Sequence, residues 1–175
     1  MDWYKTIYEL IDMRSFSNLW FWISLAVMWS SASHWVLGVP FDLATRARRK
    51  GGRAAKDFED LVRINVNRLL YIMDVSGLWV VALAFFFLTA LALLGFYYWI
   101  EFAQALFLLA FPMSMVAALS IRTACKIRSL KETGEALYRR IALTRVFIQI
   151  IGALAIFVTS MWGMYQNFAN SPLIG

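Results

Sequence analysis

Histidine and cysteine, two residue types that often bind metals or catalyse reactions, each occur once in this chain. His34 and Cys125 are far apart in the sequence, so a disulfide, four-cysteine iron–sulfur ligation and bis-histidine haem ligation are excluded within one copy. No grouping of a nucleophile, a base and an acid is evident either, so we expect no enzymatic activity. We predict no metal site and no cofactor, with one open alternative at the histidine.

His34 is the residue on which a ligand hypothesis depends. It shares one helical face with Ser30 and Ser33, at steps of three and four residues. One hypothesis is that its imidazole binds a single pigment or haem. We favour another interpretation, in which this face packs against a neighbouring helix or the imidazole reaches the membrane surface, because no second ligand is placed near it.

Small and polar residues also recur at helical spacing in two later apolar segments. Ala110, Ser114 and Ala118 form a series of small residues four apart, and Gln149 and Gly152 lie on one side of the last apolar segment. Such series let membrane helices approach closely. An alternative is that Gln149, the Ser30 face or the Ala110 series lines the pore of an oligomeric ion channel.

The composition indicates a membrane protein. Of 175 residues, 61% are hydrophobic, 17% aromatic and only 16% charged, which is too apolar for an ordinary soluble domain. Four apolar runs have about the 20 residues that a helix needs to cross a bilayer core. They cover residues 18–37, 75–99, 102–121 and 141–165. We therefore predict a single all-α domain over residues 1–175, an integral membrane bundle of four transmembrane helices.

Basic residues are unevenly divided between the two sides of this predicted bundle. Segments 38–74 and 122–140 hold nearly all of them, whereas the other side has only Lys5 and Arg14. Basic segments are retained in the cytoplasm. We therefore predict a multi-pass protein of the bacterial inner (cytoplasmic) membrane, with both termini on the outer, periplasmic side. A cleaved signal peptide is the alternative for the first run, and the acidic residues before that run argue against it.

Three segments outside the bilayer core have helical patterns. Residues 2–12 have one apolar and one charged face, which predicts a short N-terminal interfacial helix. Apolar residues at steps of three and four over residues 54–73 predict an amphipathic cytoplasmic helix. Asp74 either caps the second span or marks a bend before it. Residues 122–140, with a break near Gly134, predict a helical hairpin.

Two sets of residues on the predicted cytoplasmic side are candidates for binding. The first is a basic stretch expected to contact anionic lipid headgroups, where each charge contributes about 1 kcal/mol. Nucleic-acid binding is not expected, since the topology alone requires basic residues here. The stretch consists of Arg46, Arg48, Arg49, Lys50 and Arg53. The second set, a candidate surface for docking a protein, consists of Phe58, Leu61, Arg63, Arg128, Lys131 and Arg139.

Three segments carry a resemblance to a known family. They read DWYKTIYELIDMRSFSNLWFWISLAVMWSSASHWVLGVPFD, DLVRINVNRLLYIMDVSGLW and EFAQALFLLAFPMS. They resemble a family of short bacterial membrane proteins described as a component of the SufBCD complex. The resemblance implies a membrane protein that docks a cytosolic scaffold for iron–sulfur cluster assembly, and it supplies no active-site residues.

These patterns predict a non-enzymatic accessory or partner-docking protein of the inner membrane. Its expected partners are membrane lipids, anionic on the cytoplasmic side, and either a protein partner or further copies of itself. Two alternatives stay open. One is a small oligomeric ion channel, and the other is a subunit or assembly factor of a larger energy-converting membrane complex.

Overall fold

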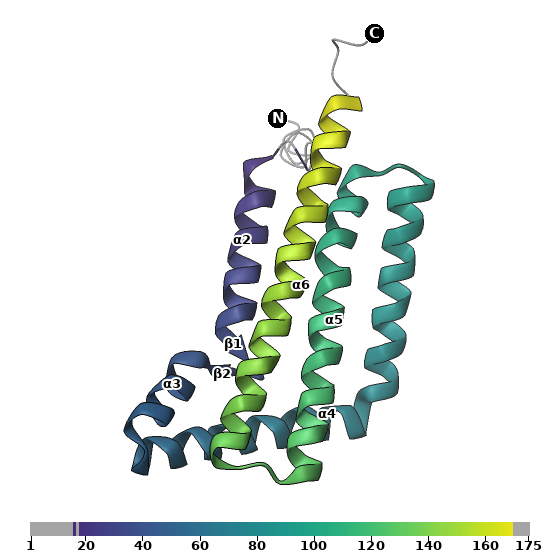
Figure 1. Ribbon diagram of the computed structural model, residues 1–175. Helices are drawn as coiled ribbons and strands as arrows, with labels where there is room; N and C mark the ends of the chain where they lie inside the picture. Colours follow the sequence, from purple (N-terminus) through teal and green to yellow (C-terminus); the bar gives the residue numbers. More distant parts are fainter. Residues whose placement is uncertain (1–15, 17, 170–175) are drawn as a thin grey trace, which may run out of the picture.

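The computed structural model describes residue 16 and residues 18–169. Upright helical segments stand in a row above a helical layer that lies across the foot of the row (Figure 1). In chain order the elements are α2 Leu19–His34, β1 Trp35–Val36, β2 Val39–Pro40, α3 Phe41–Lys50, α4 Gly52–Ala92, η2 Leu93–Tyr97, α5 Glu101–Leu130 and α6 Gly134–Ala169. The order across the row is α2, α6, α5 and the second part of α4. The foot of the row is called the base. The predicted interfacial helix at residues 2–12 lies outside the described residues.

Three helices are long and apolar enough to cross a membrane. They are Gly52–Tyr97, Glu101–Leu130 and Gly134–Phe168. They contain the predicted third and fourth spans and the predicted second span up to Tyr97, whereas Tyr98 and Trp99 lie in the connection to α5. Each helix also extends beyond its predicted span toward the base. The all-α class is therefore confirmed, and three of the four predicted spans lie in helices that are long and apolar enough to cross a membrane.

α2 is shorter than the predicted first span over residues 18–37. It has 16 residues, a length of about 24 Å at the helical rise of 1.5 Å per residue, and it is not among the three long apolar helices. The helix ends at His34 because the next residues pair as a two-stranded hairpin, in which Val36 lies opposite Val39. Both valines are fully buried. The helix lengths therefore do not establish a bundle of four transmembrane helices.

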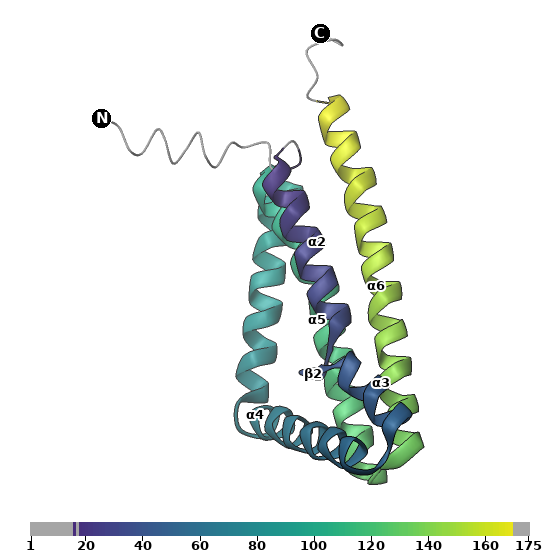
Figure 2. The ribbon, with the colours of Figure 1, turned by 90° about the vertical axis from the view of Figure 1, so that its left-hand side faces the viewer.

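α4 joins the predicted amphipathic helix and the predicted second span in one helix of 41 residues. The helix first lies across the base and then turns upright (Figures 1 and 2). We call residues 52–75 the basal part and residues 76–92 the upright part. A helix cap at Asp74 is therefore wrong, because α4 runs through this residue. Figures 1 and 2 show a bend between the basal and the upright part of α4. The stretch from Asp74 to Gly77 contains no proline, so the backbone hydrogen bonds can continue through it.

α5 and α6 form the predicted hairpin at the base. α5 ends at Leu130, α6 begins at Gly134, and Lys131 takes the left-handed conformation that ends a helix. At the other end of α5, the π-helical turn η2 and three further residues connect it to α4.

The hydrophobic core is concentrated at the base. Buried apolar residues come from the β1–β2 hairpin, α3, α4, α5 and α6. Examples, in that order, are Val36, Ala44, Val62, Ile127 and Ile141. Fully burying a side chain of this size contributes about 1.5–3 kcal/mol. In contrast, the upright part of α4 is exposed at every residue from 78 to 87. Figure 2 shows this part diverging from α5 toward the base.

Candidate functional site

Arg145 of α6 fixes the position of α3, which carries most of the predicted headgroup residues. Its Nε donates to the carbonyl of Ser33 at 3.1 Å, near the end of α2. Its guanidinium also lies 4.0 Å from the centre of the Phe41 ring, at the start of α3. A cation over an aromatic ring contributes about 0.5–1 kcal/mol at a partly exposed site. One side chain thus links α6 to the end of α2 and to the start of α3.

Two of the five predicted headgroup residues interact within the protein. Arg48 pairs with Glu135 of α6 at 3.2 Å and lies over the Tyr138 ring at 4.7 Å from its centre. Arg46 is 4.0 Å from Asp42 on the same helix, and both side chains are largely exposed. Exposed pairs of this kind contribute at most about 1 kcal/mol. Arg46 therefore remains largely available to a ligand, whereas Arg48 helps hold α3 against α6.

The other three headgroup residues form an exposed basic cluster. Arg49, Lys50 and Arg53, together with Lys56, are exposed and have no ion-pair partner in the part of the chain that the structure describes. The chain turns between them at Gly51 and Gly52, both at positive φ, a conformation that glycine adopts without strain. We call these four residues the basal basic cluster.

A cavity of about 400 Å³ lies between the basal part of α4 and the α5–α6 hairpin. It brings together three predicted docking residues, Arg63, Arg128 and Lys131. Arg63 pairs with Asp60 at 2.9 Å, and Arg128 is 3.7 Å from Asp74. Lys131 has no ion-pair partner among the residues described. The remaining lining residues are Glu59, Asp60, Val62, Val66, Asn67, Ile127, Glu132, Thr133 and Leu137.

The other predicted docking residues do not line this cavity. Phe58 is only 3% exposed and belongs to the core, and Leu61 is half-buried against the same core. Their apolar side of α4 is covered from within the chain, so Phe58 offers no surface to a partner. Arg139 is exposed on α6.

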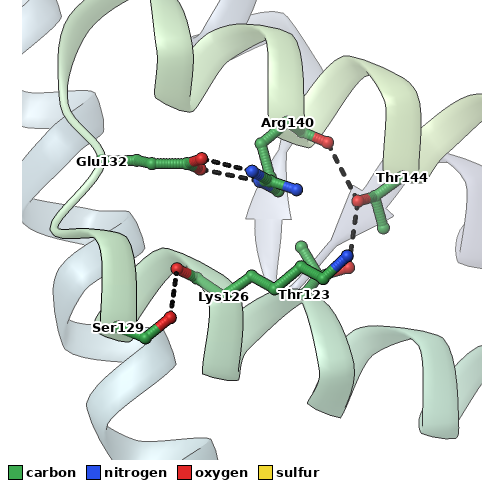
Figure 3. A network of polar contacts seen from close by, with 6 residues as sticks. All are labelled: Thr123, Lys126, Ser129, Glu132, Arg140 and Thr144. Atoms are coloured by element: carbon green, nitrogen blue, oxygen red, sulfur yellow. Dashed lines mark hydrogen bonds and ion pairs between the residues drawn. The ribbon is translucent and has the colours of Figure 1, made fainter.

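An ion pair closes the α5–α6 turn beside the cavity (Figure 3). Glu132 accepts from Arg140 Nε at 2.7 Å and also from its Nη2, with only 11% of the Glu132 side chain and 28% of the Arg140 side chain exposed. The hydrogen bond from Arg140 holds the pKa of Glu132 below its ordinary value, although desolvation opposes the shift. Below this pair, the hydroxyls of Thr123 and Thr144 lie 3.2 Å apart between α5 and α6.

Gln104, at the end of the row away from the base, is fully buried and makes three hydrogen bonds. Its Nε2 donates to the carbonyl of Gly95 in η2 at 2.8 Å. Its Oε1 accepts from Trp162 Nε1 at 3.0 Å and from Gln166 Nε2 at 2.7 Å. Because all three hydrogen-bond partners belong to the chain, Gln104 stabilises the contact between η2, α5 and α6, and its amide group is not left for a ligand.

His34 and Ser30 lie on an open side of α2. Both are exposed, and the imidazole lies edge-on to Trp35, with 5.9 Å between ring centres. The buried residues of α2 are Leu25 and Trp29 instead. The binding of a pigment or haem at His34 stays a prediction.

The small and polar residues of α5 and α6 are mostly not packed within the chain. Ala110 and Ser114 are half-buried, and Ala118 and Gln149 are exposed. Gly152 alone of these five is buried. The exposed Ala118 and Gln149 are therefore open to contacts outside one copy, and the role of these residues in helix packing or in a pore stays a prediction.

Gln104 and Arg145 were missed as organising residues by the sequence analysis. Gln104 lies at the edge of a predicted span, where polar residues are common because they can face the membrane surface. Its partners Trp162 and Gln166 are 58 and 62 residues away, so the sequence gives no sign of the contact. Arg145 lies inside the fourth apolar run, and this position is a signal, because a charge there requires a partner.

No family model, curated protein or solved structure matches this chain. The class that the fold defines is a helical membrane protein with a folded layer at one end.

Proposed function

We propose that this chain is a non-enzymatic accessory protein of the bacterial inner membrane, which docks a protein partner at its base. The supporting observation is the basal basic cluster. Its four cations are exposed and unpaired among the described residues, on a layer that Arg145 and Arg48 hold against α6. Exposed cations without ion-pair partners, held on one folded layer, are suited to bind an anionic surface.

The partner to examine first follows from the family resemblance, which names a scaffold for iron–sulfur cluster assembly. Tagged protein is purified from its own membrane in mild detergent. We expect the scaffold to co-purify with wild type and to be lost from the double variant Arg49→Gln and Arg53→Gln. The matched control, Arg122→Gln with Lys126→Gln, removes two exposed charges from α5 and should retain the partner. Equal recovery with both double variants would exclude the basal basic cluster as the docking site.

The proposal includes a specific topology, in which α2 is a fourth crossing and both termini lie on the periplasmic side. Its support is the position of α2, which stands in the row beside α6 and begins at the end where α6 finishes (Figure 1). A helix of about 24 Å can cross where the bilayer thins locally, at a cost of a fraction of a kcal/mol per Å. Alkaline phosphatase fused after Ala169 should be active, and the same fusion at Gly51 inactive. The reverse activities would overturn this orientation.

A second candidate function is that of a subunit of a larger membrane complex. The exposure of the upright part of α4 favours it. Of the span within Gly52–Tyr97, 6% is buried, against 22% and 28% in the spans of α5 and α6. Partner helices would cover such a surface. Size analysis of the complex in mild detergent tests this, since a particle that contains stoichiometric transmembrane partners would favour it over a separate accessory protein.

A further inference from the structure

The basal part of α4 has three distinct sides, where an ordinary amphipathic helix has two. With successive residues 100° apart, Phe58, Val62, Val66 and Leu70 form a buried side. A second side is polar and falls within about 60° of arc. It consists of Lys56, Asp60, Arg63, Asn67 and Asp74. The third side falls within about 100° of arc. From residue 64 to residue 75 it consists of Ile64, Arg68, Tyr71, Ile72 and Val75, and we restrict the name third side to this segment, because the same arc nearer the start of the helix carries the charged Arg53 and Asp57.

The third side is apolar and exposed. The exposed fraction is 59% for Ile64, 68% for Tyr71, 42% for Ile72 and 65% for Val75. Four large apolar side chains on one side of one helix are more than the scattered exposure that is normal for a protein surface. This side therefore requires a cover that the chain does not supply among its described residues.

The third side is followed along the same helix by an apolar surface at membrane depth. The same helix runs on into the upright part, where all residues from 78 to 87 are exposed and apolar enough to cross a membrane. A leaflet in contact with Leu78 reaches Val75 and Tyr71 within two helical turns.

Arg68 indicates the chemistry of the cover. It lies in the middle of the third side, is exposed, and has no ion-pair partner in the described chain. An arginine in this setting lays its aliphatic stem along apolar surface and extends its guanidinium to phosphate. Tyrosine, here Tyr71, also prefers the boundary between acyl chains and headgroups.

We propose that the third side of the basal part of α4 is inserted in the leaflet nearest the base, with Arg68 bound to lipid phosphate and the polar side facing water. The basal part is thus an interfacial helix and sets the depth of the whole base in the membrane. The inference does not depend on which compartment the base faces or on any protein partner.

Site-directed spin labels in phosphatidylethanolamine and phosphatidylglycerol liposomes test the proposal. In a Cys125→Ser background, Ile64→Cys and Tyr71→Cys report on the third side, and Lys56→Cys and Asn67→Cys are matched controls on the polar side. All four positions are exposed, so a label displaces no core residue. We expect the ratio of collisions with oxygen to collisions with a water-soluble nickel complex to be several-fold higher at Ile64→Cys and Tyr71→Cys.

Two outcomes would overturn the proposal. Equal ratios on the two sides would mean that the third side faces water. Protection of Ile64→Cys and Tyr71→Cys from both oxygen and nickel would mean that protein covers them, which in liposomes of the pure chain must be a second copy.

Discussion

Trp29 of α2 lies directly against Gly152 of α6. A Cβ atom placed on this glycine would be 2.8 Å from Cε3 of the indole, closer than carbon atoms approach without displacement. Trp29 is 6% exposed. The absence of a side chain at residue 152 is therefore what allows α2 to join the row.

Replacing Gly152 with leucine should separate α2 from α6. Overpacking of a tight contact costs about 1–3 kcal/mol, and we expect a loss of unfolding free energy in this range for Gly152→Leu, measured by reversible unfolding in SDS–detergent mixtures. The adjacent Ala153 is exposed, so Ala153→Leu is the matched control and should change stability little. Equal losses in the two variants would contradict the contact.

Gln104→Leu should destabilise the end of the row away from the base. The substitution leaves the Gly95 carbonyl, the Trp162 indole and the Gln166 amide without their shared partner, and an unpaired buried group costs about 1–3 kcal/mol. Hydrogen bonds in membranes average about 0.6 kcal/mol, so we expect a total loss of about 2 kcal/mol in the same assay. Gln149→Leu, at an exposed position, should be nearly neutral. A neutral Gln104→Leu would show that the bonds contribute nothing.

Much of the fold could be predicted from local patterns. Apolar runs identified the three membrane helices, and the spacing of Phe58, Val62 and Leu70 identified the basal helix. The continuous course of α4 could not be predicted, because residues 74–77 suit a bend and a break equally, and the packing of the base decides between them. The early end of α2 depends on burying Val36 and Val39 in the core at the base, which is likewise a tertiary effect.

The candidate site was only partly predictable, since charge is visible in a sequence and pairing is not. Arg48 and Arg49 are neighbours of the same type, yet Arg48 pairs with Glu135, 87 residues away in the chain, and Arg49 has no ion-pair partner among the described residues. Phe58 shows the same limit in the apolar class. Its spacing correctly indicated an amphipathic helix. The spacing does not show that α3 and the α5–α6 hairpin cover the apolar side of this helix.

Glu132 should make the stability of the α5–α6 turn dependent on pH. Its pKa is lowered in the folded protein by the hydrogen bond from Arg140. The stabilisation is therefore fully present above the ordinary glutamate value of 4.5 and is lost as the pH falls through the lower folded value. At pH 7, Glu132→Gln should cost about 1–2 kcal/mol, and its disadvantage relative to wild type should shrink on acidification below 4.5. In Glu135→Gln the lost pair is exposed, so its effect should be under about 1 kcal/mol.

Asn65 should stabilise the hairpin that ends α2. Its Nδ2 donates to the carbonyl of Gly38 at 3.1 Å, and Gly38 and Leu37 form the hairpin turn at φ values of 71° and 54°. A positive φ costs a leucine about 1–2 kcal/mol, so the turn needs support from outside. Asn65→Ala removes a hydrogen bond worth about 1 kcal/mol and should also raise amide hydrogen exchange in β1 and β2. Asn67→Ala, two residues along the same helix at an exposed position, is the control. If exchange in the hairpin is the same in both variants, Asn65 does not support the turn.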